Sequence, residues 1–209
     1  MADIIVAGNT SGSITLSAPA VSGSSVLTLP VATDTLVGKA TTDTLTNKSI
    51  AATQLTGTIA AAALPAGSVL QVVQATSTTS TATTSATYAD ATGFTATITP
   101  ISASSKILVL CDISYYIQAD NATVGGVQIV RGATAIYTDN RYAVDNVNAN
   151  VGLGGHGAFN YLDSPATTSA TTYKIQIKRT STAGTSYAFR INDTASTNIS
   201  SITLIEVAG

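Results

Sequence analysis

The sequence of 209 residues contains one histidine, His156, one cysteine, Cys111, and no tryptophan. Charged residues make up only 10% of the chain, whereas globular domains carry about 25%. The single cysteine excludes an intrachain disulfide, and its position in an apolar strand pattern indicates a small buried side chain. Acid–base, redox and metal chemistry have few side chains to use, so we expect no enzyme activity and no cofactor.

Long apolar runs and an excess of positive charge are also absent. The longest apolar runs, residues 107–111 and 59–64, fall far short of the ~18 residues that span a bilayer. Residues 1–6 carry an acid in place of the basic start of a secretory signal. A net charge of −2 provides no basic face for nucleic acid. We therefore expect synthesis inside a cell, with neither membrane insertion nor nucleic-acid binding.

Short alternating segments bounded by Thr, Ser, Gly and Asn dominate the chain after Gly67. They predict strands at residues 68–75, 93–99, 106–118, 127–131, 134–138, 157–162, 172–179, 186–192 and 199–207. About nine strands in ~140 residues indicate an all-β, antiparallel sandwich or barrel. The strand at 106–118 carries apolar residues on both faces, including Leu108 and Leu110 on the second face. Because a lone antiparallel sandwich usually exposes one face of each sheet to water, this strand indicates an oligomer.

The chain changes character near residue 66, which divides it into an N-terminal region, 1–66, and a sandwich domain, 67–209. In the first region, residues 13–17 and 25–29 are near copies of one alternation and predict two short strands joined by a turn. A region so small and so poor in large apolar residues cannot build a core alone. We expect it to fold against neighbouring molecules and to provide attachment.

Several segments resemble structural proteins of tailed bacteriophages. Tail-fibre and related virion proteins contain sequences similar to residues 14–20, 27–30, 42–50 and 55–59. Phage domains with a tumour-necrosis-factor-like jelly roll contain sequences similar to residues 93–100, 104–109, 161–174 and 201–206. The resemblance implies a trimeric virion protein with a jelly-roll knob, whose N-terminal segments wrap around the threefold axis or dock to the particle. It leaves open whether the protein is a tail fibre, a head fibre or a capsid decoration protein.

Candidate reactive residues are sparse. His156 lies between glycines with no second His or Cys nearby, which favours a surface or interface position. The acids and amides in residues 139–146 match no calcium loop and are typical turn formers, so we predict no metal site. No Gly-x-Ser-x-Gly motif and no distinguishable carboxylate pair is present.

Two surfaces are predicted from the large side chains. The apparent loop 138–150 should face a host glycan or protein through Tyr137, Arg141, Tyr142, Asn146 and Asn148. The trimer interface should include Tyr115, Ile117, Phe159 and Tyr161.

Three functions fit the sequence. A fibre or spike with a host-binding knob agrees with the segments at 42–50 and 55–59, whereas a decoration or head-fibre protein that clamps the shell agrees with the small size. A cellular β-sandwich adhesion module would explain the strands but not the N-terminal segments. We expect a virion protein of the first kind, with the second as its alternative.

Overall fold

A computed structural model describes residues 4–7, 10–16, 49–51, 53, 56–57, 59–119, 123–145, 151–181, 188–193 and 198–209. The chain forms two compact units, Met1–Thr56 and Gly57–Gly209. In the first unit, β1 (Ile4–Ala7) pairs antiparallel with β2 (Ser13–Leu16). The strand predicted at 13–17 is therefore confirmed, while the one predicted at 25–29 lies outside the described residues.

Residues 57–66 belong to the second unit, although the sequence placed them in the N-terminal region. A 3-10 turn, η2 (Ala61–Ala63), precedes the point where Gly67 donates its N–H to the carbonyl oxygen of Ala208 at 2.8 Å. Ala208 N–H in turn donates to the carbonyl of Ser68 at 2.9 Å. These bonds attach the start of the sandwich to the end of the chain.

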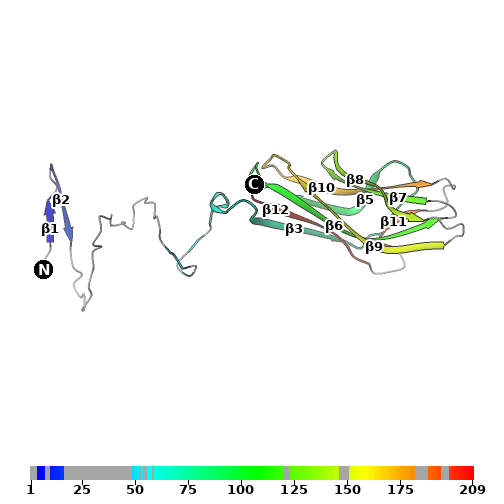
Figure 1. Ribbon diagram of the computed structural model, residues 1–209, viewed down its shortest axis with the longest axis horizontal. Helices are drawn as coiled ribbons and strands as arrows, with labels where there is room; N and C mark the ends of the chain where they lie inside the picture. Colours follow the sequence, from blue (N-terminus) through cyan, green and yellow to red (C-terminus); the bar gives the residue numbers. More distant parts are fainter. Residues whose placement is uncertain are drawn as a thin grey trace. The chain divides into compact units, whose positions relative to one another are not determined.

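The second unit consists of two antiparallel sheets (Figure 1). The first sheet orders β3 (Val69–Ser77), β12 (Ser200–Val207), β6 (Lys106–Ala119), β11 (Phe189–Ile191) and β4 (Thr81–Thr83), and β6 also pairs with β9 (Val151–Asp163). The second sheet orders β5 (Ala89–Ile98), β10 (Thr171–Ser181), β7 (Thr123–Arg131) and β8 (Thr134–Asp145). All nine predicted strands are present, and the arrangement is consistent with a jelly-roll sandwich. The sequence missed β4, a strand of three residues.

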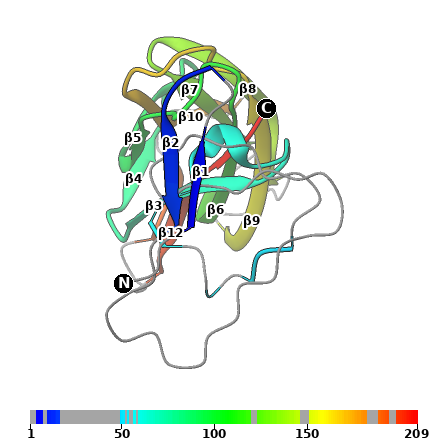
Figure 2. The same cartoon turned by 90° about the vertical axis from the view of Figure 1, so that its left-hand side faces the viewer.

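The core lies between the two sheets. Figure 2 shows the sheets viewed along the direction of their strands. Side chains alternate between faces along a strand, and β6 points Ile107, Val109, Cys111, Ile113 and Ile117 inward, each at most 2% exposed. The opposite sheet contributes mainly Phe94, Ile98, Tyr173, Ile175 and Ile177. The strands β6 and β10 therefore each bury one face in the core.

Candidate functional site

The predicted loop at 138–150 is largely a strand. β8 continues to Asp145 because β7 pairs with it, with Val124 opposite Val144 and Gly125 opposite Ala143. The loop placement of Arg141 and Tyr142 was therefore wrong. Asn146 and Asn148 lie outside the described residues, and Arg141 is exposed on the strand.

Tyr142 points into the sandwich, where it cannot offer its ring to a receptor. Its ring packs edge-on against Tyr115 and Phe159, with centroids 5.5 Å apart in both pairs. The hydroxyl is buried with no hydrogen-bond partner among the described residues, and burial raises the pKa of the phenol. Tyr137 stacks on Phe159 at 5.5 Å, so it joins the same aromatic cluster.

The residues predicted for the trimer interface divide between core and surface. Ile117 is 1% exposed and Phe159 is 8% exposed inside the sandwich of a single chain, so their placement on an interface was wrong. Tyr115 is half-buried against the core, while Tyr161 is exposed beside Tyr137 at a ring distance of 6.3 Å. Of this set, Tyr161 is the residue that the structure exposes.

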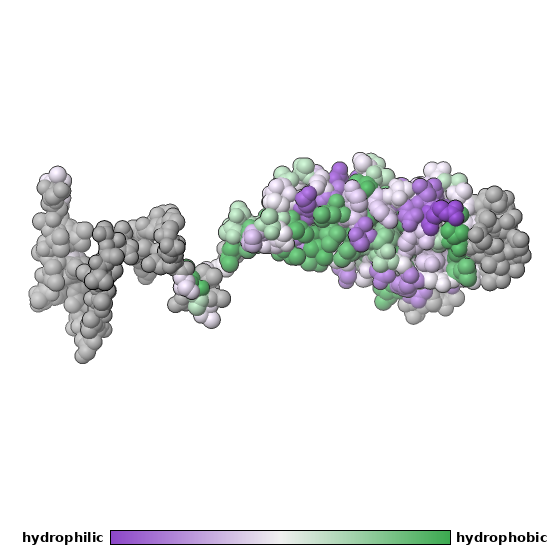
Figure 3. Space-filling view, in the orientation of Figure 1, coloured by the Kyte–Doolittle hydropathy of each residue, from purple (hydrophilic) through white to green (hydrophobic). Residues whose placement is uncertain are grey.

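A different apolar surface crosses the outer face of the first sheet. Val72, Ile205, Leu108 and Leu162 are direct neighbours across β3, β12, β6 and β9, and directly paired residues of antiparallel strands share a face. We call these four residues the apolar row. Val72 is 57% exposed and Leu162 is 51% exposed, and Figure 3 shows apolar residues gathered over these strands. Contiguous exposed apolar patches mark interaction sites.

Farther along the same outer face, the surface becomes polar and hollow. A groove of about 350 Å³ is lined by residues that include Ser114, Tyr116, Gly154, His156, Asp193 and Asn198. Nδ1 of His156 lies 3.0 Å from Oδ1 of Asp112, and both side chains are about half exposed. The histidine is on the surface as predicted, and the sequence did not indicate that β6, β9 and the start of β12 would bring these polar residues together.

Two sets of contacts restrain the residues that line the groove. The Arg190 guanidinium lies 5.6 Å from the ring centroid of Tyr116, and its NH1 lies 3.5 Å from Oδ1 of Asp193. Nδ2 of Asn198 donates to the hydroxyl oxygen of Ser114 at 2.7 Å. The groove therefore has a fixed polar wall.

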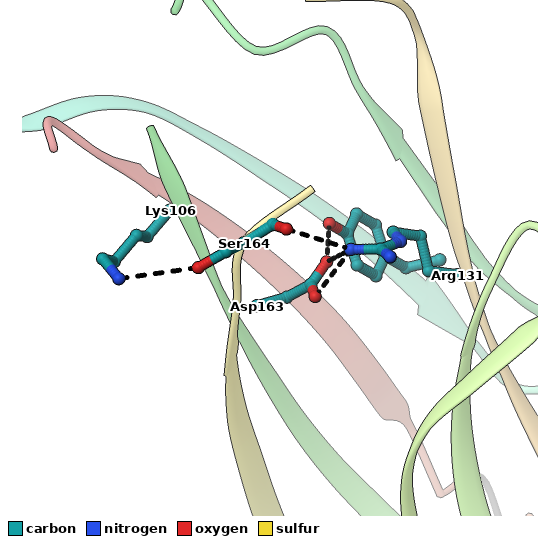
Figure 4. Close-up of polar contacts among 5 residues, drawn as sticks. Lys106, Arg131, Asp163 and Ser164 are labelled. Carbon is teal, nitrogen blue, oxygen red and sulfur yellow. Dashed lines mark hydrogen bonds and ion pairs between the residues drawn. The ribbon is translucent and has the colours of Figure 1, made fainter. Parts of the chain in front are cut away.

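A buried charged cluster at the other end of β9 has a structural role. NH1 of Arg131 donates to both carboxylate oxygens of Asp163 at 2.8 Å, and the hydroxyl of buried Tyr173 donates to Oδ2 at 2.7 Å (Figure 4). Burial and the bond to the carboxylate raise the pKa of Tyr173, so the phenol stays protonated as a donor. Lys106 and Ser164 complete the contacts at the surface. The cluster ties β7, β9 and β10 together across the two sheets.

No protein-family model and no curated protein matches this chain. Among solved structures, a chain from the structure of infectious bursal disease virus, Gx strain, is 17% identical, with a TM-score of 0.41. The match covers 68% of this chain and 34% of that chain, so the present chain spans about a third of its length. A likeness of this size carries no argument about function.

The other reactive groups are the Cys111 thiol and dispersed acidic side chains. Burial raises the pKa of the Cys111 thiol to about 12, which keeps it protonated and unreactive. Within the described residues, no three His, Cys, Asp or Glu side chains gather where they could hold a metal ion. The same part of the chain contains no helix long and apolar enough to cross a membrane.

Proposed function

We propose that this chain is a structural protein of a virion, a trimeric fibre or spike whose sandwich is a knob that contacts the host surface. The segments that resemble tailed-phage proteins support the virion assignment, and the jelly-roll strand order agrees with it. We propose that the chain has no catalytic activity and no cofactor, and that it neither binds nucleic acid nor inserts into a membrane. The N-terminal region would attach the knob to other virion proteins.

The apolar row is the main observation that supports self-association of the chain. Its four side chains, together with Leu110 in the next row, form a surface without a charged residue between them. Covering such a surface removes apolar area from water without the cost of desolvating a charge. A second copy of the same chain is the occupant we propose, and the support for three copies is the phage resemblance.

Light scattering of the full chain tests the trimer. We expect about three times the chain mass of 21.0 kDa, and Leu108→Asp or Leu162→Asp should shift the protein to monomer. Both side chains lie on the outer face, so the core is untouched, and far-UV circular dichroism should remain that of a β protein. Thr97→Asp, at an exposed position on the outer face of the other sheet, is the control outside the apolar surface. A wild-type monomer at micromolar concentration would contradict the proposal.

Electron microscopy of particles carrying a tag on this protein tests the location. Labels at the ends of projecting fibres support the host-binding role. Labels spread regularly over the shell support the alternative, a decoration or head-fibre protein, which the small size of the chain favours. Absence of the protein from purified particles would refute both versions.

A further inference from the structure

We propose that the groove beside His156 binds one unit of a neutral saccharide. The inference deepens the proposed host-contacting role and rests on it. From Leu108 to Ser114 the strand β6 advances six residues, about 20 Å at ~3.3 Å per residue. The groove therefore lies on the same sheet face as the apolar row but well away from it.

The open space around Gly154 is the first observation that points to a ligand. Three neighbouring glycines of β9 are explained by packing. An added Cβ would collide with the side chain of Tyr116 at Gly152, of Tyr115 at Gly155 or of Tyr142 at Gly157. At Gly154 the nearest atoms would be 3.7 Å and 3.8 Å away, which is ordinary contact. No packing need accounts for this bare position, and its effect is to keep the groove open.

The polar groups around the opening suit hydroxyl groups. Nδ1 of His156 contacts the carboxylate of Asp112, so Nε2 is the ring nitrogen left for a ligand. With Nδ2 of Asn198 donating to Ser114, the amide oxygen of Asn198 is left as an acceptor, and Ser114 retains its hydroxyl proton. Sugar hydroxyls both donate and accept, so they can use acceptors and donors placed side by side.

The local charge selects against anionic sugars. Asp193 lines the groove, Asp112 lies 3.0 Å from His156, and Arg190 lies beside Asp193, so the charged side chains described around the opening include two carboxylates and one guanidinium. An acidic sugar would bring another negative charge against these carboxylates, and like charges in close contact repel. A neutral sugar meets no such penalty.

Size and lining favour a small ligand over a protein partner. Ligand pockets commonly measure about 300–1,000 Å³, and the groove of about 350 Å³ is at the small end of that range. The centre of a protein interface is apolar and depleted of charged residues. This groove is lined by glycines, tyrosines and polar side chains, with no aliphatic side chain among its lining residues.

Titration of the full chain with single sugars, followed by saturation-transfer NMR, tests the proposal. The neutral probes are glucose, galactose, rhamnose and N-acetylglucosamine, and the acidic probes are glucuronic acid and N-acetylneuraminic acid. We expect at least one neutral probe to bind and both acidic probes to bind at least tenfold more weakly. Absence of binding by every neutral probe, or a preference for the acidic probes, would overturn the proposal.

Two variants locate the binding. Gly154→Ala adds a methyl group where the backbone has room, and His156→Ala removes the ring nitrogen Nε2. Each change should weaken binding of the neutral sugar at least tenfold. Asn160→Ala, on the same face of β9 and outside the groove lining, should bind as the wild type does. Unchanged affinity in both groove variants would refute the site.

Incorporation into particles distinguishes a failure of the saccharide proposal from a failure of the proposed virion role. Gly154→Ala and His156→Ala proteins should still enter particles at the wild-type copy number, so a virion role can stand if the sugar site fails. Adsorption to host cells should fall after periodate oxidation of their surface glycans. Adsorption that survives periodate and is lost after protease treatment would assign the contact to a protein and overturn the saccharide proposal.

Discussion

Two tyrosines with buried hydroxyl groups, Tyr173 and Tyr142, should respond in opposite directions to the loss of the hydroxyl oxygen. The hydroxyl of Tyr173 donates to Asp163 at 2.7 Å, and the side chain is 0% exposed. A hydrogen bond to a charged group contributes about 1.5–3 kcal/mol, so Tyr173→Phe should lower the unfolding free energy by about 2 kcal/mol. At ~2–4 °C per kcal/mol for a chain of this size, Tm should fall by about 4–8 °C.

Tyr142→Phe is the matched opposite case. Its hydroxyl is buried and has no partner among the described residues, and an unsatisfied buried polar group destabilises the folded state by about 1–3 kcal/mol. Removing the oxygen should therefore stabilise the protein by about 1 kcal/mol. The neighbouring rings of Tyr115 and Phe159 keep their contacts in the variant, because the phenylalanine ring occupies the same space.

Urea unfolding of both variants at pH 7, at one fixed protein concentration, measures the difference. The fixed concentration matters because association stabilises the folded state by mass action. If Tyr142→Phe destabilised the protein as much as Tyr173→Phe, the assignment of one paired and one unpaired hydroxyl would be wrong.

Three further outcomes are expected. Gly125→Ala should lower the unfolding free energy by about 1–3 kcal/mol, a typical cost of overpacking, because the new Cβ would lie 2.5 Å from the ring of Phe189. A Tm equal to that of the wild type would contradict this. Burial opposes ionisation of Glu206, but hydrogen bonds from groups that include Gln71 and the Ile101 N–H outweigh it and lower its pKa. The carboxylate therefore stabilises the fold above pH ~4.3 and loses that effect as the pH falls through its lowered pKa, so the stability gap between wild type and Glu206→Gln should narrow on acidification. Deletion of residues 1–56 should leave a folded sandwich that no longer enters particles, and normal incorporation would refute the attachment role.

The alternation of side chains made much of the sandwich predictable. In β10, Tyr173, Ile175 and Ile177 point inward while Lys174 and Gln176 are partly exposed, as the period of two requires. This alternation is a local property of the sequence, so it can be recognised without knowing the partner strand. It also placed β6 correctly along almost its whole length.

The second half of β8 was missed because its composition argues for a turn. Asp139, Asn140 and Arg141 are residues that loops favour, and strand preference depends strongly on context. Pairing with β7 supplies that context, since Thr123 lies opposite Asp145. Tertiary pairing therefore overrides the local preference, and with it the predicted receptor loop.

The apolar row and the groove could not be found by reading along the chain. Val72, Leu108, Leu162 and Ile205 are far apart in sequence, and only the pairing of β3, β12, β6 and β9 aligns them. Alternation along the chain marks only Leu108 of the four as apolar on a second face, and the predicted interface included Ile117 and Phe159, which belong to the core. A strand register is needed before such a surface becomes visible.

The way the chain enters the sandwich has a mechanical consequence. The segment after η2 leads directly into β3, which lies at the edge of its sheet and pairs with β12 in eight residue pairs, from Ser200 opposite Ser77 to Val207 opposite Val69. If the far end of the sandwich is held while the N-terminal segment is pulled, the force acts along β3 and loads the hydrogen bonds between β3 and β12 together. Strands loaded in shear resist tension better than strands opened one bond at a time, so the sandwich should withstand a pull in this direction.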